Sequence, residues 1–253
     1  MIYDLQRASM WKRISAYLFD AILLSIVAVL FAWMMSCLLG FDRYSDTLNA
    51  AYTHYGESYG VNFNLSLQEY EALSADEIEK LNTAYAAMAG DQEAVGAYNM
   101  LIQLMLLITS LGLLFAFAIM EFLIPLKLGN GQTLGKKIFG IGLMQQDGVC
   151  INGRLLFIRT ILGKYTLETM IPILIVMMIW FGLLGLTGTL VLLGILLVQF
   201  LMLLLTRNRL AIHDAMSATV AVDVASQLIF PDRAAMIAYK ERIHAEAAAR
   251  EPY

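Results

Sequence analysis

The chain has 253 residues, of which 59% are hydrophobic and only 15% are charged, and its net charge is −4. Soluble domains have about 45–50% apolar and about 25% charged residues, so a core of this size cannot bury the apolar excess. Composition therefore predicts an integral membrane protein with the lipid bilayer as its solvent. It gives no support to nucleic-acid binding, because the basic residues form no stripe with interleaved aromatic residues.

Two apolar segments in the first half predict transmembrane helices. The first covers 14–40 and is interrupted by Asp20, and the second covers 99–126 and contains Glu121. Each is long enough to cross about 30 Å of hydrocarbon at about 1.5 Å per residue. No convincing small-residue cleavage site follows the first segment, so we interpret it as an uncleaved helix.

The apolar region 171–205 contains no charged residue. As a single helix it would be about 50 Å long, which is far more than a bilayer requires. Gly182 and Gly185 lie near its middle. We therefore expect two helices, about 165–184 and 189–206, joined by a tight turn, which brings the total to about four; one long tilted helix is the alternative.

The distribution of basic residues predicts the orientation of the chain. The segment 41–98 contains only Arg43 and Lys80, and all the other lysines and arginines lie in the terminal regions or in the segment 127–164. Cytoplasmic loops carry the excess of Lys and Arg. We therefore expect a multi-pass protein of the cell membrane with both termini cytoplasmic and 41–98 outside. This arrangement requires an even number of helices, which independently supports dividing the third apolar region.

The segment 41–98 is strongly acidic and is expected to be a separate helical, extracellular insertion. Two capping boxes, in which a serine and a glutamate satisfy the first free backbone amides of a helix, are predicted in it. They are Ser66 with Glu69 and Ser74 with Glu77. Asp91 is expected to begin a helix that continues into the second span. The insertion is either a ligand or partner site or, as we favour, a solvated acidic cap over helix ends.

Short cytoplasmic elements are expected around the third span. The segments 138–144 and 149–151 are separated by Asp147-Gly148, a strong turn dipeptide, and predict a small β-hairpin. The segment 218–223 alternates like a strand and would complete a three-stranded sheet.

Two helices are also expected on this side of the membrane. The segment 155–165 carries apolar and basic residues in a pattern that predicts an amphipathic helix at the membrane interface. The tail 234–249 is rich in alanine and charged residues and predicts a surface helix.

Titratable groups within or beside the predicted spans form the candidate site. Asp20 and Glu121 lie one to two turns into the membrane from its cytoplasmic side, and Glu168 lies a little shallower. Such groups are costly in a bilayer unless they are paired or face water, and they mark ion or proton paths. The candidate binding or ion-coupling residues are Arg13, Asp20, Glu121, Glu168, His213 and Asp214.

Arg13 is expected to pair with a carboxylate from another element, with Asp214 as the favoured partner. Arg207 and Arg209 are competing partners for that carboxylate. The pairing leaves Asp20 for Glu121, a proton or a cation. In the alternative interpretation, these charges only fix the register of the helices.

Motifs of enzymes and of cofactor sites find no support in the sequence. The histidines are His54, His213 and His244. They are scattered and form no metal-ligand set. The segment 135–137 lacks the hydroxyl residue and the upstream glycine spacing of a phosphate loop, and Gly-x-Ser-x-Gly is absent. We therefore expect no enzymatic activity, no metal and no cofactor.

Several segments together resemble a known family. They are WKRISAYLFD at 11–20, GQTLGKKIFGIGL at 131–143 with Asp147-Gly148 after it, Arg159, and LAIHDAMSATVAV at 210–222. In this combination the chain resembles the RDD family of membrane proteins. The family name refers to one arginine and two aspartates, which match Arg13, Asp20 and Asp214. The resemblance implies a multi-pass helical domain that is described as a transporter of undefined ligand, with some members associated with sodium–proton exchange.

The resemblance covers about 7–40 and 99–223. The expected organisation is a transmembrane domain formed by 1–40 and 99–223, the insertion 41–98, and a cytoplasmic tail, 224–253.

Two functions from different classes fit these features. The first is a transporter or ion-coupled carrier of a cation or a proton, which with four helices would need a homo-oligomer to enclose a path. The second is a non-transporting scaffold or accessory subunit that binds a partner through the insertion or the cytoplasmic strands. No feature of the sequence separates the two.

Overall fold

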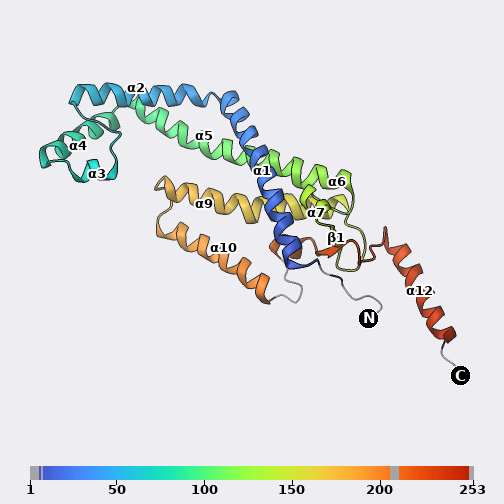
Figure 1. Ribbon diagram of the computed structural model, residues 1–253. Helices are drawn as coiled ribbons and strands as arrows, with labels where there is room; N and C mark the ends of the chain where they lie inside the picture. The colour runs from blue at the N-terminus through green and yellow to red at the C-terminus, as the bar shows by residue number, and fades with distance from the viewer. Residues whose placement is uncertain (1–5, 7, 206–210, 251–253) are drawn as a thin grey trace. The chain divides into compact units, whose positions relative to one another are not determined.

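Four apolar helices dominate the chain, of which the computed structural model describes Gln6 and residues 8–205 and 211–250 (Figure 1). Among these residues, three helices are long and apolar enough to cross a membrane. Their bounds are Met10–Leu39, Gln92–Leu128 and Gly153–Trp180. A further apolar helix, α10 (Leu186–Leu205), has 20 residues. The all-α membrane architecture expected from composition is confirmed.

The second and third spans are composite helices. They consist of α5 (Gln92–Phe117), η1 (Ala118–Leu123) and α6 (Ile124–Leu128), and of α8 (Gly153–Phe157), η2 (Ile158–Met170) and α9 (Ile171–Trp180). The η segments are π-helical, with hydrogen bonds that reach five residues rather than four. In each span a proline, Pro125 or Pro172, is the second residue after the η segment. Proline lacks an N–H, and in a regular α-helix its ring would clash with the carbonyl four residues earlier. The wider π-helical turn before each proline avoids this clash.

The third span begins earlier than predicted. The amphipathic helix expected at 155–165 is not a separate interfacial element, because α8 and η2 continue into α9 without a break. Asn152 starts this helix, since its side-chain Oδ1 accepts a hydrogen bond of 2.9 Å from the amide of Leu155. The helix runs without interruption from the basic residues of α8 and η2 into the apolar residues of α9, so the predicted division near residue 165 is wrong.

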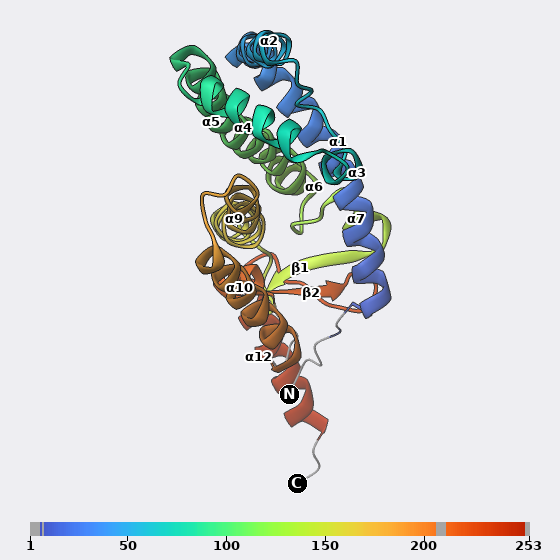
Figure 2. The same cartoon turned by 90° about the vertical axis from the view of Figure 1, so that its left-hand side faces the viewer.

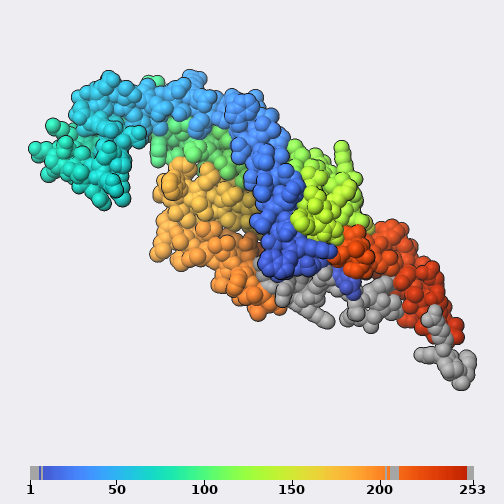
Figure 3. Space-filling model, in the orientation of Figure 1, coloured from blue at the N-terminus to red at the C-terminus, as the bar shows by residue number. Residues whose placement is uncertain are grey.

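The predicted division of the last apolar region is confirmed. The helix α9 ends at Trp180, α10 begins at Leu186, and the two pack against each other (Figures 1 and 3). Gly182 has a φ of 69°, a left-handed conformation that glycine adopts without a steric cost. Large apolar side chains of α10, such as Leu186 and Phe200, are exposed, which suits contact with lipid.

The sheet differs from the expected hairpin. The strand β1 (Ile141–Gln145) pairs antiparallel with β2 (Thr219–Asp223), so the sheet has two strands from distant parts of the chain (Figure 2). The turn at Asp147-Gly148 forms, but 149–151 contributes only isolated bridges, from Cys150 to Met144 and from Val149 to Phe230. The cap of α8 at Asn152 stops this segment from extending, and the predicted segment 219–223 supplies the strand that pairs with β1 along its whole length.

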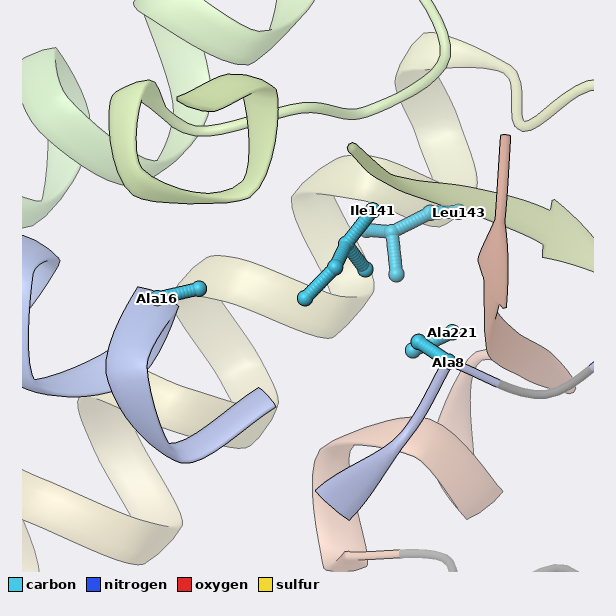
Figure 4. Close-up of a cluster of buried hydrophobic side chains, with 5 residues drawn as sticks. All are labelled: Ala8, Ala16, Ile141, Leu143 and Ala221. Carbon is cyan, nitrogen blue, oxygen red and sulfur yellow. The ribbon is translucent and has the colours of Figure 1, made fainter. Parts of the chain in front are cut away.

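The sheet packs against the start of α1 (Met10–Leu39) through a small apolar cluster. It comprises Ala8, Ala16, Ile141, Leu143 and Ala221, all buried (Figure 4). Alanines at the helix and on β2 leave room for the larger side chains of β1. This cluster fixes the sheet beside the part of α1 that carries Arg13 and Asp20.

Contacts between residues divide the chain into two compact units. The core unit comprises residues 1–31 and 112–253, and the insertion unit comprises 32–111. Besides the spans and α10, the core unit contains two short helices, α7 (Leu134–Ile138) and α11 (Ile212–Met216), and the longer C-terminal helix α12 (Arg233–Arg250). The helix predicted for the tail is therefore present.

The insertion unit is helical, as predicted. Besides parts of α1 and α5, it contains α2 (Phe41–Tyr59), α3 (Leu67–Glu71) and α4 (Ala75–Ala89). Both capping boxes form, and Asp91 caps α5 by accepting hydrogen bonds from the amides of Glu93 and Ala94. Phe63 packs edge-on between Tyr52 and Tyr85, with ring centroids 5.4 and 4.8 Å apart.

Candidate functional site

Asp20 joins α1 to the start of α7. The residue is 9% exposed, and its Oδ1 accepts a hydrogen bond of 2.7 Å from the amide of Gly135. Its Oδ2 accepts a second hydrogen bond from the hydroxyl of Thr133, the N-cap of α7. A side chain at Gly135 would place a Cβ 2.5 Å from the carbonyl oxygen of Ala16, so only glycine permits this approach. Of the partners left open for Asp20, Glu121 is not one, because its carboxylate binds Lys164 instead.

Asp214 forms the most deeply buried ionic contact. It lies on α11, is 1% exposed, and binds Nη1 of Arg159, which also donates a hydrogen bond of 2.7 Å to Thr219 Oγ1. Arg13 reaches the same carboxylate, but its Nη2 is 3.9 Å from Oδ2, so Arg159 rather than Arg13 is the main partner. Burial alone would raise the pKa of Asp214, but the Arg159 guanidinium outweighs it and holds that pKa well below its usual value.

Two further arginines were considered as partners of Asp214. Arg207 and Arg209 lie outside the described residues. The contact with Arg159 arises because α11 packs against η2, the π-helical segment that carries this arginine.

Glu121 pairs with Lys164 between the two π-helical segments. Nζ of Lys164 lies 2.7 Å from both carboxylate oxygens of Glu121. The backbone carbonyl of Glu121 is the one that Pro125, four residues later, cannot bond as an α-helix would require. The hydroxyl of Thr160 donates to that carbonyl at 3.0 Å. The contact therefore ties η1 to η2 through both the side chain and the backbone.

Glu168 and His213 join η2 to α11. The amide of His213 donates to Glu168 Oε1 at 2.9 Å, and its Nδ1 lies 2.6 Å from Oε2. Burial, together with the charge of Arg159, lowers the pKa of His213. The imidazole is therefore neutral near pH 7, with the Nδ1–H donated to Glu168. Gly163 allows the approach, because a Cβ there would lie 2.6 Å from the His213 side chain.

These contacts surround a partly open cavity of about 130 Å³. Its charged lining residues are Arg13, Asp20, Glu121, Lys136, Arg159, Lys164 and Asp214. His213 also lines it, so the cavity collects every candidate residue from the sequence except Glu168, which binds His213. Among the described residues, no three His, Cys, Asp or Glu side chains form a metal-ligand group.

Comparison with known families decides the membership of the chain. The sequence model of the RDD family matches residues 7–218, which is most of the chain. The chain belongs to the RDD family. No curated protein and no solved structure matches it significantly. The cavity described above is lined by all three residues of the RDD name, Arg13, Asp20 and Asp214.

Lys136 is the least expected member of this RDD site. It follows Gly135 on α7 and lines the cavity, while its neighbour Lys137 is exposed. Within the described part of the chain, the Lys136 ammonium makes no ion pair and no hydrogen bond; only its backbone amide is bonded, to Thr133 Oγ1. Burial lowers the pKa of Lys136 to about 7, and the nearby Lys164 acts in the same direction.

A repeated sequence pattern marks the two glutamates as parts of π-helical segments. Glu121 and Glu168 each stand four residues before a proline, in EFLIP at 121–125 and ETMIP at 168–172. Each proline ends a π-helical segment, and such segments are frequent at functional sites. The pairing of Lys164 with Glu121 had no comparable signal, because it depends on how two helices rotate against each other.

Proposed function

We propose that this RDD protein is a proton-coupled ion carrier and that the charged cavity is its coupling site. The observation that carries the proposal is the buried carboxylate of Asp20 on the first span. Among the described residues it has no cationic partner and is held only by hydrogen bonds from Thr133 and Gly135. A charge at the centre of a span costs about 2.5–3.5 kcal/mol on insertion scales, so such a group marks an ion or proton path by default.

The balance of charge favours a proton over a metal cation. Three carboxylates share the cavity with four basic side chains, and two of those carboxylates, Glu121 and Asp214, already bind Lys164 and Arg159. A metal ion needs several oxygen ligands, and among the described residues only one of the three carboxylates is free of a cationic partner, whereas a proton needs only one acceptor oxygen. Four helices are few for a carrier, so we expect a homo-oligomer in the bilayer.

The test is proton flux in proteoliposomes that contain the purified chain. A pH gradient across the vesicle should drive proton movement, measured by a pH-sensitive dye inside. Asp20→Asn keeps the size of the side chain and one of its two acceptor oxygens but cannot titrate, so flux should vanish while the protein stays folded. The exposed Asp46 offers a matched control, because Asp46→Asn should carry flux like the unmodified chain.

A second candidate, a non-transporting scaffold or accessory subunit, is supported by the satisfied pairs in the same cavity. Arg159 with Asp214 and Lys164 with Glu121 connect α11, η2 and η1, and this could be their whole role. Under this alternative, the unmodified chain carries no flux under any ion gradient, and Asp20→Asn changes only stability.

The orientation and the cell membrane location are part of the proposal. The excess of Lys and Arg in 127–164 and near both termini supports a cytoplasmic location for these segments. The native cysteines, Cys37 and Cys150, are free and can be replaced by serine first. An impermeant thiol reagent added outside intact cells should then label a cysteine at Glu79 and not one at Lys137. Labelling in the reverse pattern would overturn the orientation.

A further inference from the structure

The cavity contains more positive than negative side chains. Arg159 is matched by Asp214 and Lys164 by Glu121, while Asp20 is held by uncharged donors. The cations that remain are Arg13, whose nearest carboxylate oxygen is 3.9 Å away and is shared with Arg159, and Lys136. With Asp20 counted against them, one positive charge is left over among the side chains that line the cavity; Glu168, which binds His213, is not one of them.

Lys136 shows where that excess is concentrated. Its side chain lines the cavity without an acceptor among the described residues, and Arg13 lines the same cavity from α1. Both side chains are partly buried. A Lys ammonium offers three donors and an Arg guanidinium five, and donors withdrawn from solvent are normally satisfied. The cavity therefore presents unused donors and one unbalanced positive charge, which is the chemistry that an anion requires.

We propose that this cavity binds one small monovalent anion, such as chloride or formate, with Lys136 and Arg13 as its ligands. The size of the cavity, about 130 Å³, admits such an ion with a few waters but not a large organic acid. A single charge matches the excess of one. If the protein is the proposed carrier, this anion is its co-substrate. Anion transport rests on the proposed function, whereas anion binding does not.

Protonation of Lys136 links the anion to the proton. The charged or titratable groups that face it across the cavity are Arg13, Asp20, Glu121, Arg159, Lys164, His213 and Asp214. The anion binds the ammonium form, and the pKa of Lys136 is lowered to about 7. Affinity is therefore full below that pKa and is lost as pH rises through it. Each bound anion retains one proton on Lys136, so anion and proton move in the same direction.

Equilibrium binding to the purified full-length chain tests the site. Chloride and formate are titrated calorimetrically as sodium salts against a sodium gluconate background of equal ionic strength. For the unmodified chain, the Kd should be about tenfold higher one pH unit above the pKa of Lys136 than one unit below it. Binding that is absent, equally strong for gluconate, or independent of pH would overturn the proposal.

Three variants assign the effect to Lys136. Lys136→Gln should raise the Kd about tenfold or more and remove its pH dependence. Lys136→Arg keeps the charge at all accessible pH values, so it should bind the anion without the pH dependence. Lys137→Gln, the exposed neighbour, should behave like the unmodified chain. If Lys136→Gln does not fold, the Lys136→Arg variant and the pH series decide the matter.

Transport separates this inference from the proposed function. If the chain binds chloride with the expected pH dependence but carries no proton flux, the carrier function is wrong and the anion site stands. If proton flux is equal in chloride and gluconate and no anion binds, the anion site is wrong and the carrier function stands.

Discussion

The two units of the chain use polar side chains in opposite ways. In the insertion unit the capping partners are exposed and only three residues apart, as in Ser74 with Glu77. In the core unit the partners are buried and far apart in the sequence: Asp20 and Thr133 are separated by 113 positions, and Arg159 and Asp214 by 55. The first kind of contact shapes one helix, and the second holds together elements that are distant in the sequence.

The difference has an energetic side. An exposed capping contact replaces water by a protein partner and contributes about 1 kcal/mol. A buried ionic contact contributes little when complete, but removing one partner leaves a charge without compensation. Substitutions in the core unit should therefore have larger effects than those in the insertion unit.

The largest effect is expected for Arg159→Met. It leaves the carboxylate of Asp214 buried without its main partner, which should reduce the free energy of unfolding by about 3–5 kcal/mol. Denaturant unfolding in detergent micelles measures this loss. Arg154→Met, an exposed position in the same continuous helix, should change stability by no more than about 0.5 kcal/mol. Equal effects of the two changes would contradict the importance of the Asp214 contact.

A smaller loss is expected for Gly135→Ala. The added Cβ would lie 2.5 Å from the Ala16 carbonyl oxygen, so α7 must move away from α1 at a cost of about 1–3 kcal/mol. The matched change in the insertion unit, Gly96→Ala, meets no atom within 4 Å on an exposed face of α5. That variant should be about 1 kcal/mol more stable, because alanine favours a helix over glycine. Thermal unfolding of the two variants should move in opposite directions.

Ser74→Ala should cost about 1 kcal/mol, and only locally. It removes the acceptor for the amide of Glu77 at the start of α4. Hydrogen exchange should accelerate in the first turn of α4 and stay unchanged in the core unit. Faster exchange in β1 or β2 would show that the two units are more strongly coupled than their contacts indicate.

The smallest effect is the response of the same capping box to acid. Hydrogen bonds from the side chain and the backbone of Ser74 lower the pKa of Glu77 below its ordinary value. The contribution of this carboxylate is thus complete above that ordinary value, 4.5, and is lost as pH falls through the lowered pKa. A titration followed by NMR of the Glu77 side chain should show a midpoint below that of the same residue in Ser74→Ala. Identical midpoints would rule out the hydrogen bonds as the cause.

Sequence patterns predicted the elements that depend on neighbouring residues. The two capping boxes, the helix start at Asp91 and the turn near Gly182 all follow from local backbone chemistry. The depth of Asp20 and Glu121 in their spans was also accessible, because it follows from counting residues along a helix.

Among contacts between distant segments, the strand at 219–223 beside β1 and the approach of Arg13 to Asp214 were expected, but the others were beyond such patterns. The sequence favoured Arg13 as the partner of Asp214, but the rotation of η2 brings Arg159 closer. The hairpin expected from Asp147-Gly148 is reduced to a single bridge between Met144 and Cys150, because the cap of α8 at Asn152 ends the segment 149–151. Lys136 had no signal of its own, since only the approach of α7 to α1 turns one of two adjacent lysines inward.

The long π-helical segment η2 makes the site depend on the number of residues as well as on their kind. Arg159 and Lys164, five positions apart, line the same cavity because each turn of η2 holds more residues than an α-helix. In a regular α-helix, five positions correspond to a rotation of about 140° from one side chain to the other. A residue inserted or deleted between them without a compensating change of helix geometry would turn Lys164 and everything after it by roughly a quarter of a turn relative to Arg159. Single-residue insertions and deletions between 158 and 170 are therefore the genetic changes that this cavity tolerates least.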